Sequence, residues 1–333
     1  MKSLAIAAVA LLLSVPTAWS QEKLILVTAS PAGGDNSIFY NDWGKKVGAA
    51  SQGAIEIDVR DGATLANFGN VLDRVGNDVI QVGWMLHGLI GGKFPLTETA
   101  SLPYVIEDAE VGSVALWRLY KSGALDAEYR EAVPLYFGIT GVNNVHFSKP
   151  LRVADDFHGL KIRVVGKPQS QAIEMFGGTP LAMPPQDMYD GLHRGTIEGV
   201  LTPWSAFSPF KLNEVTAYHV EIPLGGTTSM VFMMRKKFDA LPAAGRKALE
   251  ANGLEPQSRV FGAYLKNQGV GPRNVALSQP DKHKIVQLPP DRFAMWKGKV
   301  SAAVYEEWGK QVPGAKQILD GYGKIYAEVK AAR

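Results

Sequence analysis

The chain has 333 residues, of which 46% are hydrophobic and 20% are charged, a composition that suits a globular protein of about two domains. Its formal net charge of +3 is small and its basic residues are scattered, so we expect no nucleic-acid partner. The sequence contains no cysteine, which excludes disulfide bonds, thiolate zinc sites, a thiolate nucleophile and a lipoprotein anchor.

The first twenty residues are typical of a secretory signal peptide. Lys2 precedes an apolar run at residues 4–15, Pro16 breaks that run, and Ala18 and Ser20 follow at the spacing of a cleavage site. The run is shorter than the roughly 20 apolar residues that a membrane span needs. We expect cleavage after Ser20, and a disulfide-free exported protein of this size indicates a bacterial periplasm.

The segment after the signal peptide alternates between strands and helices. The predicted elements are a strand at residues 24–29, a turn-forming loop at 30–36, a helix beginning near Ile38, a strand at 55–59, a helix around 68–75 and a strand at 79–84. This order is typical of a layered parallel sheet, in which ligands gather at the carboxyl ends of the strands.

A second series of the same kind begins after Leu135. It consists of strands at residues 136–140, 145–147 and 160–165, helices at 168–176 and 186–194, a strand at 228–233, a helix near Leu241 and two or three amphipathic helices. The segment 177–180 lacks the Lys-Ser/Thr ending of a phosphate loop and is predicted to be a turn.

We therefore expect an α/β protein of two lobes. Residues 21–140 plus about 228–268 form lobe I, and residues 141–227 plus about 269–333 form lobe II. The stretch from residue 234 to the end is too helical and too long for one lobe, so we expect the chain to cross between the lobes more than once.

Arg163 stands between Ile162 and Val164 in a strand that reads as buried. A buried guanidinium requires a facing anion, because leaving its charge unpaired away from water is costly. That anion is either a protein carboxylate in a structural ion pair or the carboxylate of a ligand, to which the planar fork of donors is well matched. Residue type alone leaves both alternatives open.

Other candidate residues have equally open interpretations. Trp84 and Trp204 follow strands, where an aromatic side chain forms either a wall of a binding site or part of the core. The six histidines include no HxH or HxxxH pair, so we expect no histidine metal site. A secreted hydrolase would need a nucleophile with a base, and the sequence contains no G-x-S-x-G elbow. We expect no catalytic residue, no enzyme activity and no cofactor.

Two segments resemble one known family. Residues 155–164, DDFHGLKIRV, are similar to the "eDlkGlkiRv" signature of the solute-binding proteins of tripartite ATP-independent periplasmic (TRAP) transporters, and residues 176–199 resemble that family's "lGa.P..mp..evY.aLq.GviDG". The resemblance implies two α/β lobes, joined by crossing strands and a long helix, that close over an organic acid. It also implies that Arg163 holds the carboxylate and that integral membrane subunits receive the ligand.

Departures from the family pattern concern specificity. Asn143 stands where sialic-acid-binding members carry a second arginine, and Thr202 stands at a frequent asparagine. We therefore expect a monocarboxylate with an apolar or aromatic body. The candidate ligand-binding residues are Arg163, Asn143, Thr202, Trp204, Trp84, Met85, Pro185 and Gly226.

Two alternatives remain within the binding class. One is a C4-dicarboxylate or uronate-type sugar acid, whose extra oxygens Asn143, Thr202 and Gln186 would satisfy. The other is a binding protein that docks on a sensor instead of a permease. We expect a monomer in either case.

Overall fold

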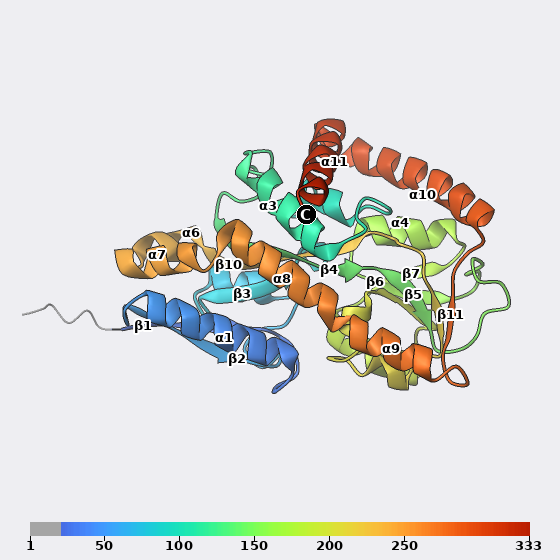
Figure 1. Ribbon diagram of the computed structural model, residues 1–333, viewed down its shortest axis with the longest axis horizontal. Coiled ribbons are helices and arrows are strands. Elements are labelled where there is room, and N and C mark those ends of the chain that lie inside the picture. The colour runs from blue at the N-terminus through green and yellow to red at the C-terminus, as the bar shows by residue number, and fades with distance from the viewer. Residues whose placement is uncertain (1–20) are drawn as a thin grey trace, which may run out of the picture.

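Two separate β-sheets divide the molecule into two lobes (Figure 1). The computed structural model describes residues 21–333, and the expected signal peptide lies outside the described residues. One sheet has five strands in the order β2-β1-β3-β10-β4, and the other has six in the order β11-β9-β5-β8-β6-β7. The predicted two-lobed α/β fold is confirmed.

The strands of the first sheet are β1 Glu22–Val27, β2 Ile55–Arg60, β3 Val82–Leu86, β4 Ala132–Val142 and β10 Gly226–Met234. Those of the second sheet are β5 Asn144–Phe147, β6 Lys161–Val164, β7 Thr179–Ala182, β8 Gly199–Thr202, β9 Tyr218–Val220 and β11 Lys284–Val286. The α-helices are α1 Asp35–Ala50, α2 Val71–Gly76, α3 Ala109–Lys121, α4 Lys167–Met175, α5 Met188–His193, α6 Arg235–Ala240, α7 Ala243–Ala251, α8 Leu254–Gln268, α9 Val270–Ser278, α10 Pro290–Gln311 and α11 Ala315–Ala331. Short 3₁₀ helices lie at His87–Leu89, Thr97–Ser101, Pro185–Asp187, Trp204–Ala206 and Leu212–Glu214.

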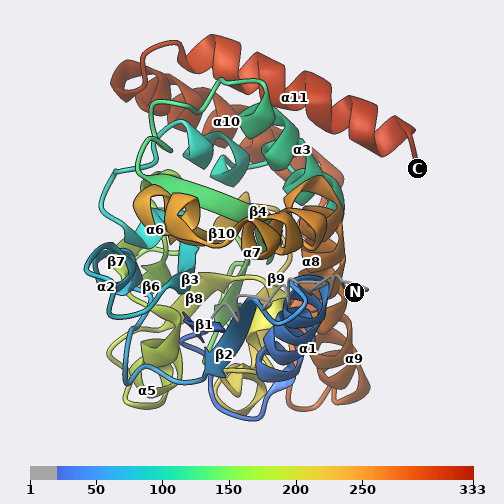
Figure 2. The ribbon, with the colours of Figure 1, turned by 90° about the vertical axis from the view of Figure 1, so that its left-hand side faces the viewer.

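Strand β1 lies within the first sheet, parallel to β2 and β3. Its side chains at Leu24, Leu26 and Val27 are fully buried, as expected for a strand with helices on both faces of its sheet. Helices α1 and α7 pack together on one side of this sheet, and α3 packs against β4. Figure 2 shows α3 and α11 on the side away from α1.

The chain passes between the lobes in two strands that contact each other. Strand β4 runs almost directly into β5 through Asn143, and the chain returns through Leu224 and Gly225 into β10. The backbone N–H of Asn143 donates to the carbonyl of Gly225 at 2.8 Å, and the N–H of Leu224 donates to the carbonyl of Asn143 at 3.0 Å. The two crossings therefore behave as one short ribbon.

Helices also join the lobes. Helix α8 packs against β4 of the first lobe, and after Gly269 the chain continues as α9, which packs beside β11 of the second (Figure 1). The long helix expected from the sequence thus has a break at Gly269. Helix α10 packs on α4 in lobe II, whereas α11 returns to α3 and buries Tyr322 and Tyr326 there.

The sequence expectation for residues 177–180 was only half right. Gly177 has a positive φ of 83° and forms the turn, but Thr179 already begins β7, which pairs in parallel with β6. Strand β7 lies at the edge of its sheet, where Pro180 costs no ladder hydrogen bond. In residues 21–333, no helix is long and apolar enough to cross a membrane.

Candidate ligand-binding site

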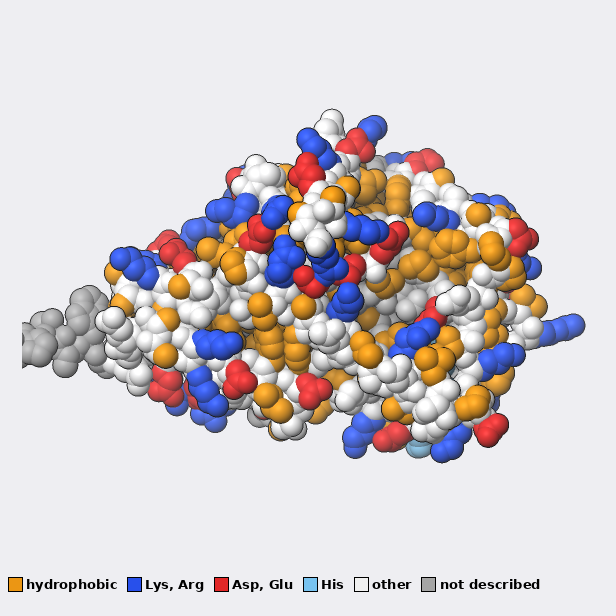
Figure 3. Space-filling model, in the orientation of Figure 1, with side chains coloured by type: hydrophobic (Ala, Val, Ile, Leu, Met, Phe, Trp, Pro, Cys, Tyr) orange, Lys and Arg blue, Asp and Glu red, His pale blue; other side chains and the backbone are white. Residues whose placement is uncertain are grey.

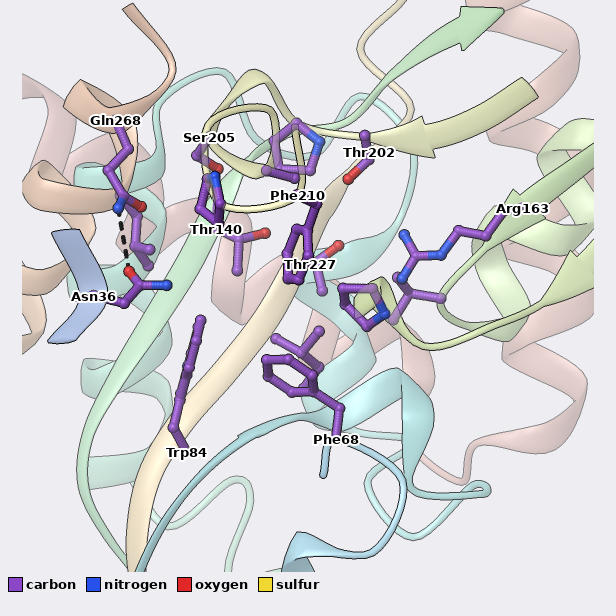
Figure 4. A pocket seen from close by; sticks show the side chains of 17 residues that line it. Asn36, Phe68, Trp84, Thr140, Arg163, Thr202, Ser205, Phe210, Thr227 and Gln268 are labelled. Atoms are coloured by element: carbon purple, nitrogen blue, oxygen red, sulfur yellow. Dashed lines mark hydrogen bonds between the residues drawn. The ribbon is translucent and has the colours of Figure 1, made fainter. Parts of the chain in front are cut away.

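A cavity lies where the two lobes meet, at the carboxyl ends of β3 in the first lobe and of β6 and β8 in the second (Figure 4). Its lining consists of Asn36, Phe68, Trp84, Leu86, Thr140, Arg163, Val165, Pro185, Thr202, Pro203, Ser205, Ala206, Pro209, Phe210, Thr227, Leu265 and Gln268. Strand ends are the usual place for a ligand in α/β sheets.

Arg163 reaches this cavity because of the alternation of strand side chains. Its neighbours Ile162 and Val164 point into the core of the second lobe, so Arg163 points to the opposite face of β6. The residue is only 1% exposed. Its Nε donates to the carbonyl of Met183 at 2.7 Å, and its Nη1 lies 3.4 Å from the carbonyl of Leu201.

The remaining guanidinium nitrogen, Nη2 of Arg163, is buried and has no hydrogen-bond partner within residues 21–333. No carboxylate of the described chain forms an ion pair with Arg163, and Asp187 acts on it only at longer range. This arrangement rules out the structural ion pair within that part of the chain. A buried N–H without an acceptor is costly, so the geometry favours an anion supplied from outside.

The charge of Arg163 persists in this environment. Burial lowers its pKa to about 9, and the carboxylate of Asp187 opposes that shift. The guanidinium is therefore protonated at neutral pH. It is a fixed cation whose two backbone bonds hold its plane in place.

Aromatic rings form the walls between the two ends of the cavity. Figure 4 shows Trp84 and Phe68 on one side and Phe210 on the other. The rings of Trp84 and Phe68 are 5.3 Å apart in an edge-to-face arrangement. The indole N–H of Trp84 is buried without an acceptor among the described residues. Seven of the other 14 lining residues are aliphatic or proline, so ten of the 17 lining residues are apolar.

A few hydroxyl groups interrupt this apolar lining. Thr202 and Thr227 lie toward the arginine in Figure 4, and Thr140 and Ser205 lie further from it. The hydroxyl of Ser205 donates to the carbonyl of Thr140. The hydroxyl of Thr227 exchanges hydrogen bonds with the amide of Asn143, which lies outside the lining.

Comparison with known proteins identifies the family. Residues 31–310 match the family described as "Bacterial extracellular solute-binding protein, family 7". The chain belongs to this family, the DctP-like solute-binding proteins of TRAP transporters.

Among curated relatives, the C4-dicarboxylate-binding periplasmic protein DctP of Rhodobacter capsulatus is 25% identical over 289 residues, which cover 85% of this chain and 82% of the relative. A solved TRAP solute-binding protein from a marine metagenome (unidentified microbe), specific for aromatic acids and in complex with metahydroxyphenylacetate, has a TM-score of 0.86 at 23% identity. A second, from Rhodoferax ferrireducens T118 with copurified benzoate, has a TM-score of 0.85 at 24% identity. Each alignment covers 93% of this chain and 99% of the solved chain.

The structure brings four of the eight candidate residues of this family member to one cavity: Arg163, Trp84, Pro185 and Thr202. Met85 does not line it. Adjacent strand residues point to opposite faces, so Met85 packs into the other core of the first lobe, with Phe137 and Met230. Gln186, invoked for the sugar-acid alternative, is not among the lining residues.

The other three candidates lie behind the lining. Trp204 packs its ring 4.4 Å from that of Phe207 and 4.7 Å from that of His146 and donates to Glu221, so it supports the second lobe. Asn143 lies in the crossing ribbon. A Cβ at Gly226 would stand 2.4 Å from a carbon of Ile106, so its lack of a side chain serves core packing.

Thirteen of the 17 lining residues were not selected from the sequence, among them Asn36, Phe68, Phe210 and Gln268. Asn36 is the last residue of the loop at 30–36, which follows a predicted strand. This position at the carboxyl end of a strand was the sequence signal that could have identified Asn36 as a lining residue. No sequence signal marked Gln268, because only the path of α8 brings this residue to the cavity.

Three histidines far apart in sequence form a hydrogen-bonded chain beneath this site. Nε2 of His146 lies 3.1 Å from the carbonyl of Thr202, and Nδ1 of His146 lies 3.0 Å from Nδ1 of His219. Nε2 of His219 lies 3.1 Å from Nδ1 of His283. In residues 21–333, no group of His, Asp and Glu has the arrangement of a metal site.

The protonation of this chain follows from its burial. Burial lowers the pKa of His146 well below its usual value, with a further contribution from His219. Burial and then the neighbouring His283 lower the pKa of His219 to about 3. The pKa of His283 is also lowered, by burial and by Lys282. The three imidazoles are therefore neutral at neutral pH. Each neutral ring has one nitrogen that donates and one that accepts a hydrogen bond, as the chain requires.

Proposed function

We propose that this protein captures a monocarboxylate with an aromatic body in the periplasm and delivers it to the membrane subunits of a TRAP transporter. One observation carries the proposal. Nη2 of Arg163 is buried without a partner within residues 21–333, on the wall of an otherwise largely apolar cavity between the lobes. A ligand carboxylate would complete its hydrogen bonds and offset its charge in a site shielded from water.

The aromatic body is supported by the walls of the cavity. Phe68, Trp84 and Phe210 offer ring faces and edges, and such contacts contribute about 0.5–1.5 kcal/mol each beyond the area that they bury. The metagenome and Rhodoferax proteins, which share this fold, hold metahydroxyphenylacetate and benzoate. These ligands are precedents for an aromatic acid between two such lobes.

A C4-dicarboxylate is the second candidate, and the relationship to the DctP protein of Rhodobacter capsulatus favours it. A second carboxylate would need a second cation or several donors. Arg163 is the one cationic residue among those that line the cavity in the described chain. The lining therefore favours one carboxylate.

A ligand screen distinguishes the two candidates. The mature protein, from residue 21 onward, is heated with benzoate, 3-hydroxybenzoate, succinate, malate or glucuronate, and the unfolding midpoint is measured. A ligand that binds the native state raises the midpoint by mass action. We expect shifts with the aromatic acids. A shift confined to succinate and malate, or to glucuronate, would overturn the aromatic assignment.

The remaining parts of the proposal concern the whole protein. We propose that it acts as a monomer, that the mature chain begins at Gln21, and that it releases its ligand unchanged. Gel filtration, N-terminal sequencing of the exported protein and recovery of the intact acid after incubation test these three points. The sensor alternative predicts instead that no TRAP membrane subunits are encoded beside it.

A further inference from the structure

The cavity has a second polar end, opposite Arg163. Figure 4 shows Asn36 and Gln268 on the far side of the aromatic rings from the guanidinium, with a hydrogen bond between their amides. Asn36 is only 5% exposed and lies near the start of α1, and Gln268 ends α8. Two carboxamides from separate helices thus meet at the distal end of an apolar space.

The hydrogen bonds of these amides are almost all accounted for within the protein. Oδ1 of Asn36 accepts from the hydroxyl of Tyr264 at 2.8 Å and from Nε2 of Gln268 at 3.1 Å. The second hydrogen of Nε2 of Gln268 goes to the hydroxyl of Tyr264 at 2.6 Å. Nδ2 of Asn36 donates one hydrogen to the hydroxyl of Ser30 at 2.9 Å. These bonds hold both amides in place.

One hydrogen-bond donor and one acceptor of these two amides remain without partners in the described chain. A primary amide carries two N–H donors, so Nδ2 of Asn36 retains one, and Figure 4 shows this nitrogen directed toward the middle of the cavity. Oε1 of Gln268 accepts no hydrogen bond within residues 21–333. The distal end therefore offers one donor and one acceptor side by side. A hydroxyl group both accepts and donates, and so matches this pair.

We propose that Asn36 and Gln268 recognise a hydroxyl group on the part of the ligand farthest from its carboxylate. This inference rests on the proposed function, because it takes the Arg163 end as the carboxylate end. It assigns the substrate class as aromatic monocarboxylates with a ring hydroxyl at position 3 or 4, and it makes these two amides the residues that select it.

The hydrogen bond between the two amides also ties α1 to α8. A hydroxyl that satisfied both the remaining donor and the remaining acceptor would gain hydrogen bonds at fixed partners. One such bond is worth about 1 kcal/mol net, and two correspond to a preference of roughly tenfold or more over the unsubstituted acid.

The test is a set of binding isotherms of the mature protein with benzoate and with 2-, 3- and 4-hydroxybenzoate. The 2-isomer is the internal control, since its hydroxyl lies beside the carboxylate. We expect the 3- or 4-isomer to bind roughly tenfold more tightly than benzoate and the 2-isomer to show no such gain. In Gln268→Met, which removes the acceptor and keeps the length, the preference should fall to about threefold. Gln257→Met, on the same helix but outside the cavity lining, should retain it.

The results distinguish failure of the hydroxyl recognition from failure of the proposed function. If the aromatic acids bind and the wild type shows no preference for a hydroxyl, or if Gln268→Met keeps the preference in full, the inference is overturned while the proposed function stands. If none of the aromatic acids binds to a protein that melts cooperatively, the proposed function fails and the inference fails with it.

Discussion

Asn143 and Thr227 hydrogen-bond through their side chains across the two strands that join the lobes, with Nδ2 of Asn143 lying 3.2 Å from Oγ1 of Thr227. Thr227 lines the cavity, and Asn143 lies in the ribbon on which the lobes cross. The binding surface and the interlobe connection therefore share one buried contact. In a two-lobed binding protein, such a contact can couple occupancy of the site to the angle between the lobes.

We predict that Asn143→Ala destabilises the protein by about 1–3 kcal/mol, because it leaves the buried hydroxyl of Thr227 without its partner. Urea unfolding of the ligand-free protein measures this loss. Thr227→Ser, which keeps the hydroxyl, is the control and should lose much less. Equal losses in the two variants would show that the hydrogen bond is not the cause.

Trp84 and Met85 provide a matched pair on one strand. We predict that Trp84→Leu weakens ligand binding at least about tenfold, because it removes a ring from the cavity wall. Met85→Leu changes an almost volume-matched core residue on the opposite face and should leave the affinity within about twofold. Titration calorimetry measures both. A larger loss in Met85→Leu than in Trp84→Leu would contradict the assignment of the two faces.

The histidine chain predicts a loss of stability in acid. The folded state lowers the pKa of His219 to about 3, whereas the unfolded chain has an ordinary value near 6.5, so the unfolded state binds more protons between these limits. The stabilising contribution is complete above pH 6.5 and is lost as the pH falls toward 3. The free energy of unfolding should therefore drop by up to about 1.4 kcal/mol per pH unit for each such histidine.

Unfolding in urea at a series of pH values between 7 and 4 tests this slope. His219→Gln keeps a hydrogen-bonding side chain that does not titrate, so its slope should be shallower than that of the wild type. Parallel pH profiles for wild type and His219→Gln would refute the assignment.

Asp155 is predicted to fasten α10 to the second lobe. Its carboxylate accepts two bonds of 2.8 Å from Arg292 and one of 2.5 Å from the indole N–H of Trp296, and its side chain is only 2% exposed. Asp155→Asn should cost about 1–3 kcal/mol in thermal or urea unfolding, because it leaves a buried donor without a good acceptor.

The exposed pair of Lys316 and Asp320 supplies the comparison for Asp155. Asp320→Asn is chemically the same change on the surface and should stay within about 0.5 kcal/mol of the wild type. If both substitutions cost the same, burial of the Asp155 carboxylate is not what stabilises the contact.

The sequence pointed to Arg163 because a charge inside an apolar strand demands an anion and the family signature surrounds it. The structure places this residue in the cavity lining, and its role toward a carboxylate stays a prediction. The sequence failed at Met85 because alternation along β3 says which residues share a face but not which face meets the cleft. Gln268 could not be predicted from the sequence, since Asn36, its hydrogen-bond partner, lies 232 positions away. The histidine chain was hidden for the same reason: its members are separated by 73 and 64 positions.

The central claim is that Arg163 holds the carboxylate of the ligand. Titration calorimetry of benzoate against the mature wild type, Arg163→Met and Arg152→Met tests it most directly, because the first variant removes the cavity cation and the second removes an exposed arginine of the same lobe. We predict heat of binding for the wild type and Arg152→Met and none for a folded Arg163→Met. Wild-type affinity in Arg163→Met would contradict the account.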